Sequence, residues 1–255
     1  MAPREFPMCT RRTLLTAALA VPVAGLAACA GKPPEPECGD LAALPTVERV
    51  GGALLVSEAS GRPGPIPMAQ GFADQLGAWA DHWAEISPGV DQLWLWPPAP
   101  GDDGSCTWRA AGRGVELTRL RAGRELVADL RIPTAELDGD DATARWRLIA
   151  GLNRYFANVD TEADRGLAID DQWPLEAPKK QTTGPFTTFR RNNIHQVRCA
   201  QALAAVMWQR PVSIDGSWGD ETAGALKEIL TELDLPTDLT RPEAWQGLLQ
   251  HAEQP

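Results

Sequence analysis

The feature that most constrains this sequence is a short stretch near its C-terminal end, residues 213–226, which reads SIDGSWGDETAGAL. Asp215 can hydrogen-bond backbone amides ahead of it, and Gly216 and Gly219 can adopt positive φ, so the chain can reverse tightly here. Amphipathic segments flank this loop on both sides. We therefore expect helices that fold back on one another, with the ring of Trp218 directed into a small core between them.

Residues 189–255 resemble the small three-helix peptidoglycan-binding domain found beside many bacterial cell-wall enzymes. The specific part of the resemblance is the pattern Asp-Gly-x-aromatic-Gly-x-x-Thr, which runs from Asp215 to Thr222. The other matching residues are Val197, Gln201, Leu203, Ala225, Leu226, Leu235, Trp245 and Leu248. The resemblance implies a three-helix C-terminal domain that binds peptidoglycan.

The motif can also be explained by folding alone. A structural role is available for each residue of the motif, namely Asp215, Gly216, Trp218, Gly219 and Thr222. The acidic residues that follow Gly219 are favourable at the start of a helix, near the positive end of its dipole. The motif therefore identifies the module without locating its ligand surface. The sequence also departs from the family at residues 227–230, where KEIL replaces the usual aromatic residue and Gln.

Charge within this region is polarised. Residues 181–210 hold four arginines and no acid, whereas residues 211–255 hold nine acids and two basic residues. Peptidoglycan stems carry carboxylates, which arginine binds in a bidentate manner, so we expect Arg190, Arg191 and Arg198 to contact the ligand. The alternative is that these arginines pair with the acidic second helix.

The first 28 residues predict an export signal. Three arginines precede a short, alanine-rich apolar run that is too short for a stable membrane span. Residues 10–15, TRRTLL, resemble the twin-arginine export signal in part, and the general secretory route is the alternative.

Residues 26–29, LAAC, resemble a bacterial lipobox in which Cys29 is lipidated and becomes the first mature residue. A plain secretory signal with an incidental cysteine is the other interpretation.

Residues 29–43 are rich in proline and predict a tether between a lipid anchor and the folded protein. Ala30, by resemblance to enteric lipoproteins, favours the periplasmic face of the outer membrane.

The expected mature chain is acidic. The full sequence has 24 basic and 34 acidic residues, and removing residues 1–28 takes away three Arg and one Glu. The remaining 21 basic and 33 acidic residues give a formal net charge of −12. That charge argues against nucleic acid as a partner, since nucleic-acid binding needs basic patches.

Three cysteines remain in the expected mature chain, Cys38, Cys106 and Cys199. Disulfides persist in exported proteins, and three thiols allow one bridge. Because Cys199 falls on the core-facing side of a helical pattern, we expect Cys38 to pair with Cys106. The alternative is that both are free.

Residues 44–160 predict an α+β domain of no recognised family, in which helices cover one face of an antiparallel sheet. Apolar residues at steps of three and four predict a helix over residues 69–86, and Asp140 and Asp141 open a second helix. The expected strands are residues 51–57, 90–98, 106–110, 115–121 and 125–132. Residues 161–188, polar and interrupted by proline and glycine, predict a linker to the C-terminal domain.

No catalytic constellation is evident in the sequence, and it predicts no metal site and no cofactor. His195 and Cys199 share a helix face, but packing is the favoured interpretation of this pair. Glu58, Asp81 and Asp91 could converge as a carboxylate pair for sugar hydrolysis, and a deep pocket that collected Glu58, Asp81, His82 or Asp91 would support this. Two classes of function therefore remain: a non-catalytic lipoprotein that binds peptidoglycan, and a cell-wall hydrolase whose site lies in residues 44–160.

Overall fold

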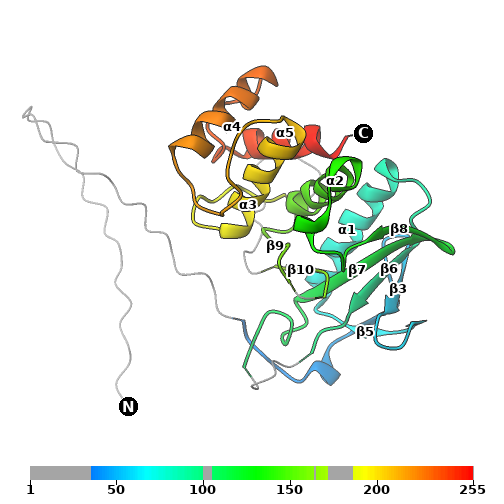
Figure 1. Cartoon of the computed structure of the whole chain (residues 1–255). Helices are drawn as coiled ribbons and strands as arrows, with labels where there is room; N and C mark the ends of the chain where they lie inside the picture. Colours follow the sequence, from blue (N-terminus) through cyan, green and yellow to red (C-terminus); the bar gives the residue numbers. More distant parts are fainter. Residues whose placement is uncertain (1–35, 100–104, 164, 172–185, 255) are drawn as a thin grey trace, which may run out of the picture. The chain divides into compact units, whose positions relative to one another are not determined.

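A computed structural model describes residues 36–99, 105–163, 165–171 and 186–254 of the chain (Figure 1). The expected export signal, Cys29 and parts of the tether and linker lie outside these residues. No helix in the described ranges has the length and apolar character needed to cross a membrane.

The fold is α+β, as the sequence predicts, and it is built on an eight-stranded sheet. The strands follow the order β2-β3-β6-β7-β10-β9, with β4 paired to β3 and β8 paired to β7. Their bounds are β2 Arg49–Val50, β3 Ala53–Ser57, β4 Arg62–Pro63, β6 Gln92–Trp96, β7 Gly114–Ala122, β8 Glu125–Asp129, β9 Asn158–Asp160 and β10 Leu167–Asp170. Strands β1 Thr46–Val47 and β5 Ile66–Pro67 form a separate antiparallel pair.

One strand pair departs from the expected antiparallel arrangement. Strands β3 and β6 run parallel, and helix α1 (Gln70–Ile86) connects them, so the sheet is mixed. A parallel pair needs a crossover of this kind, whereas antiparallel strands can be joined by a tight hairpin. Every other strand pair in the described sheet is antiparallel.

Helices α1 and α2 (Gly139–Tyr155) lie on the same side of the sheet (Figure 1). The residues that predicted α1 form its inner face, since Phe72, Leu76 and Trp79 are fully buried. In α2 the apolar side chains of Trp146, Ile149 and Leu152, spaced three residues apart, are buried as well. Two short 3₁₀ turns, Leu41–Ala43 and Thr134–Glu136, lie in the connections.

The segment 106–110, expected as a strand, instead forms a helical turn. The backbone N–H of Ala110 donates to the hydroxyl of Thr107 at 3.0 Å, and that of Ala111 donates to the Thr107 carbonyl at 2.9 Å. Gly112 follows with a φ of +70°, which reverses the chain into β7. Local side-chain hydrogen bonding of this kind competes with a strand ladder, and β propensity does not report it.

A disulfide joins Cys38 to Cys106, as expected, with Cα atoms 5.6 Å apart. It ties the N-terminal end of the described chain to the turn that precedes β7. Cys199 is free and fully buried, and burial raises the pKa of its thiol.

The C-terminal region contains the three expected helical segments. Helix α3 (Ile194–Ala202) continues into a π-helical turn, Leu203–Met207, and α4 (Asp220–Glu232) and α5 (Pro242–Glu253) follow. Asn193 caps α3 by accepting the N–H groups of His195 and Gln196, and Pro242 occupies the first turn of α5, where its missing N–H costs nothing.

The expected boundary between residues 44–160 and 189–255 does not separate two cores. Helix α5 packs along α2, and α3 contacts both α2 and β9. Residues of the sheet, α2 and the C-terminal helices belong to one hydrophobic core, and the described residues form one compact unit. The structure therefore does not confirm a separate three-helix domain.

Candidate functional site

The loop that carries the motif, residues 215–222, is called the motif loop and is held on α3 by the buried side chain of Gln201. The Gln201 Nε2 group donates to Asp215 Oδ1 at 2.8 Å, to the Ser217 carbonyl at 3.0 Å and to Thr222 Oγ1 at 3.1 Å. Its Oε1 accepts the backbone N–H of Gly216 at 2.8 Å. One side chain therefore fixes both the loop and the start of α4.

Asp215 and Gly216 have the structural roles that their residue types predict. Asp215 accepts the N–H of Ser217 at 2.8 Å, and this bond, followed by the one from Gln201, lowers the pKa of its carboxyl group. Gly216 has a φ of +76°, and an added Cβ would lie 2.5 Å from Cγ1 of Ile194. Gly219 differs from the expectation: its φ is −132°, an extended conformation open to other residues.

Trp218 packs against the hydrophobic core, as expected, but it is only partly buried. The ring packs on Phe189 with centroids 5.1 Å apart, and the guanidinium of Arg191 lies 5.3 Å from its centroid. The fully buried tryptophan of this region is Trp245, whose Nε1 donates to Thr187 Oγ1 at 2.9 Å. Trp218 is therefore partly exposed, with a cation beside its ring.

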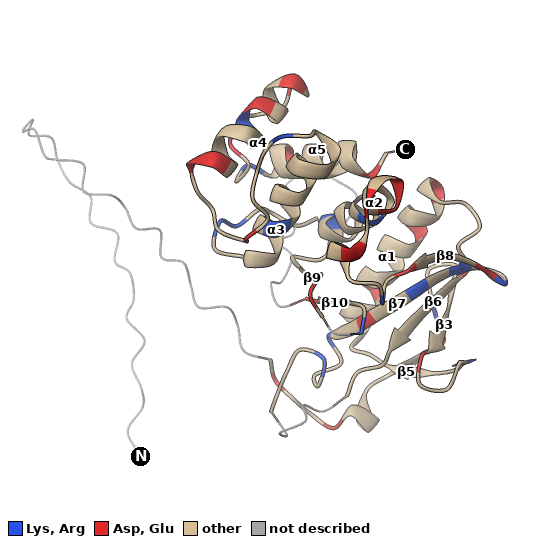
Figure 2. Cartoon of the chain, in the orientation of Figure 1, with Lys and Arg blue, Asp and Glu red and all other residues tan. Residues whose placement is uncertain are grey.

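The three candidate arginines do not lie on one helix face. Arg190 and Arg191 precede α3, and only Arg198 lies within it. Arg198 is bound to Glu162, while Arg191 forms a long 3.8 Å pair with Asp238, in which both side chains are more than half exposed. The backbone N–H of Arg190 donates to Gln196. Acidic residues are spread along α4 (Figure 2). Arg191 and Arg198 pair with Asp238 and Glu162, which lie outside α4, whereas Arg210 binds Glu232 of α4.

The candidate catalytic residues of the sheet region do not converge. Glu58 accepts Arg119 at 2.6 Å and the Thr118 hydroxyl at 2.8 Å. Asp81 accepts the backbone N–H of Gly52, and Asp91 accepts that of Gly123. Each carboxylate therefore accepts hydrogen bonds from its own neighbours, at a different place in the fold.

His82, which is partly exposed, belongs to a cluster around the buried Glu253 that the sequence did not suggest. Its Nε2 lies 3.0 Å from Glu253 Oε1, and the same carboxylate oxygen is bound by Arg154. Glu253 is fully buried, and the cluster joins α1, α2 and α5. One feature of the sequence could have indicated that Glu253 is buried: it falls on the apolar face of its helix, in line with Trp245 and Leu249.

His195 and Cys199 do not form a reactive pair. The Nδ1 atom of His195 lies 3.7 Å from Asp160, and burial lowers the pKa of its imidazole. Since burial also raises the pKa of the Cys199 thiol, the protonated thiol is favoured. Packing is therefore the better interpretation. Among the described residues no group of three or more His, Cys, Asp and Glu side chains is arranged to hold a metal ion.

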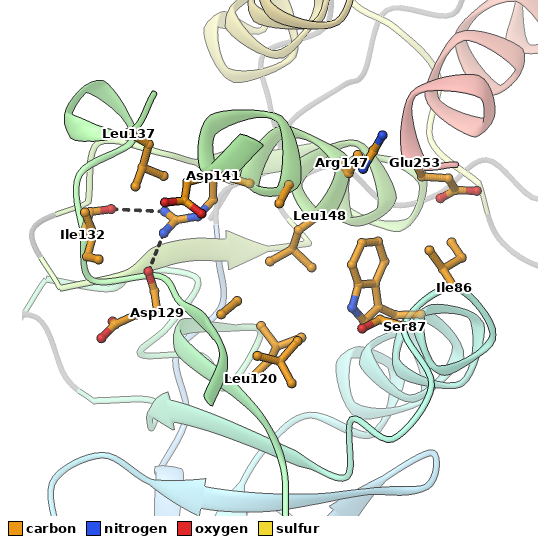
Figure 3. A pocket seen from close by; sticks show the side chains of 15 residues that line it. Ile86, Ser87, Leu120, Asp129, Ile132, Leu137, Asp141, Arg147, Leu148 and Glu253 are labelled. Carbon is orange, nitrogen blue, oxygen red and sulfur yellow. Dashed lines mark hydrogen bonds between the residues drawn. The ribbon is translucent and has the colours of Figure 1, made fainter. Parts of the chain in front are cut away.

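A pocket of about 380 Å³ opens between the end of α1, helix α2 and strand β8 (Figure 3). Ile132, Leu137 and Asp129 lie at one end, and Ile86, Arg147 and Glu253 lie at the other. Arg145 lines the pocket, with its guanidinium donating to the backbone carbonyls of Ile132 and Asp129. None of the residues predicted from the sequence as ligand contacts or catalytic groups lines this pocket.

Comparisons with protein-family models, with curated proteins and with solved structures find no match to this chain.

Proposed function

We propose that this protein is a non-catalytic, lipid-anchored protein of the bacterial cell envelope that binds peptidoglycan through its C-terminal region. The observation that carries the proposal is the motif loop, which resembles that of peptidoglycan-binding domains and is fastened by Gln201 through four hydrogen bonds. A loop fixed in this way presents neighbouring side chains with little loss of entropy on binding.

The surface best suited to the ligand centres on Trp218 and Arg191, with Arg190 beside Arg191 in the sequence. A partly exposed indole can pack against the sugar or peptide, and a guanidinium can bind a stem carboxylate in a bidentate manner. The pair between Arg191 and Asp238 is exposed and long, so exchanging it for a ligand carboxylate costs little. Arg198 is better understood as a structural residue, because it binds Glu162.

Co-sedimentation with purified insoluble peptidoglycan tests this proposal, using the whole chain from residue 30 onwards. Replacing Arg190 and Arg191 together with Gln should weaken retention about tenfold, the effect of losing one charged hydrogen-bonded contact. The matched control Arg198→Gln should leave retention unchanged, and the helical circular dichroism of both variants should match that of the parent. A folded parent protein that stays in the supernatant would exclude peptidoglycan as the ligand.

The lipid anchor is tested separately, because Cys29 lies outside the described residues. Palmitate should label the full-length protein, and Cys29→Ala should abolish the labelling and release the protein into the soluble periplasmic or secreted fraction. Unchanged labelling in this variant would reject the lipobox interpretation while leaving peptidoglycan binding open.

The hydrolase alternative gains no specific support from the described residues. Glu58, Asp81 and Asp91 occupy separate places, each with its own hydrogen-bond donor. A muropeptide-release assay with the same protein distinguishes the two classes, and we expect no release.

A further inference from the structure

We propose that the pocket between α1, α2 and β8 is a binding site for a small amphiphile with an apolar body and one acidic head group. The site is independent of the proposed peptidoglycan surface, since none of its lining residues belongs to the motif loop or to the candidate arginines. Its volume of about 380 Å³ lies in the range typical of small-molecule pockets.

The walls of the pocket select an apolar body. Trp83, Leu120 and Leu148 are buried and line its inner part. Val127 and Ile132 also line it, yet 43% and 42% of their surfaces are exposed, which is unusual for large apolar side chains in this protein. A ligand with an aliphatic body would cover these two side chains and gain their burial.

Unpaired hydrogen-bond donors favour an acidic head group. Arg147 forms no ion pair with any described residue, and its Nε is buried without a hydrogen-bond partner there. The indole Nε1 of Trp83 is also buried without a partner among the described residues. Buried donors without acceptors are costly, and a ligand carboxylate at Arg147 would satisfy the guanidinium.

The acidic residues that line the pocket do not remove its preference for a ligand with an acidic head group. Asp129 is paired with Arg131, and Glu253 with Arg154, although Glu253 Oε2 has no partner among the described residues. Asp141 lies in the first turn of α2, where the helix dipole offsets its charge. Of the two arginines that line the pocket, the buried Arg145 donates to backbone carbonyls, which leaves Arg147 as the cation that can pair with a ligand acid.

Isothermal titration calorimetry with three ten-carbon probes tests the assignment, at concentrations below those at which the probes form micelles. Sodium decanoate should bind the chain from residue 30 onwards with a stoichiometry of one. Decanol should bind about tenfold more weakly, because it lacks the charge that Arg147 pairs with. Absence of decanoate binding, or tighter binding of decanol or of decyltrimethylammonium, would overturn the proposal.

Two matched pairs of variants place the site. Val127→Asp adds a like charge to the pocket wall and should reduce decanoate affinity at least tenfold. Leu126→Asp, at the adjacent and equally exposed position that does not line the pocket, should not change it. Arg147→Gln should reduce the affinity about tenfold, whereas the exposed Arg124→Gln should not. Equal effects within either pair would show that decanoate binds elsewhere.

Discussion

Gln201 shows how one buried amide can determine the conformation of a whole loop. Its side chain is 1% exposed and bonds to Asp215, Ser217, Thr222 and the backbone of Gly216. The sequence predicted Gln201 only as a match to the family pattern, and the turn chemistry of Asp215 and Gly216 could be predicted from their residue types. The partner of the loop could not be predicted, because sequence spacing does not show which helical side chain turns toward it.

We expect Gln201→Leu to reduce the free energy of unfolding by about 3 kcal/mol, since it leaves several polar groups of the loop without partners. Urea unfolding followed by circular dichroism measures this change. The control Gln250→Leu, at an exposed position of α5, should stay within about 0.5 kcal/mol of the parent. Equal stability of Gln201→Leu and the parent would mean that the loop is not held by this side chain.

At the scale of elements, the sequence predicted helices well and strands unevenly. The apolar stripes of α1 and α2 determine their buried faces, and the sequence also predicted both ends of α1 and the start of α2 to within a residue or two. Strands β9 and β10 were not predicted, because three or four residues in a polar context carry too little periodicity. The pairing of α5 with α2 was missed for a different reason: an amphipathic pattern shows that a face is buried but not which element covers it.

The cluster of His82, Arg154 and Glu253 makes the contact between α2 and α5 sensitive to charge. Glu253→Gln should cost about 3–5 kcal/mol, because Arg154 would be left buried without its carboxylate. The double variant Arg154→Met with Glu253→Met should recover most of that loss, since an apolar pair can replace a buried ion pair. Urea unfolding of the single and double variants measures both effects. The exposed Glu243→Gln serves as the control and should change stability little. Additive losses in the double variant would show that the two side chains do not act as a pair.

On the scale of the whole molecule, the C-terminal helices are part of one folding unit with the sheet. Trp245, Leu248 and Leu249 of α5 are fully buried, and α2 is the helix against which α5 packs most extensively. The motif loop identifies the region by resemblance, but its helices depend on α2 for their burial. For this reason the co-sedimentation experiment with peptidoglycan uses the chain from residue 30 onwards and not a C-terminal fragment.

We therefore expect a fragment of residues 186–255 to lack a cooperative unfolding transition. Exposing three large apolar side chains of α5 costs about 4.5–9 kcal/mol, at about 1.5–3 kcal/mol each, which is comparable with the entire stability of a small domain. The fragment also lacks His82 and Arg154, so Glu253 loses both of its partners. Urea titration followed by far-ultraviolet circular dichroism should show a gradual loss of helix for the fragment and a single sharp transition for the chain from residue 30 onwards. A sharp transition in the fragment would instead establish residues 186–255 as an independent domain that merely docks on α2, and peptidoglycan binding could then be measured on the fragment alone.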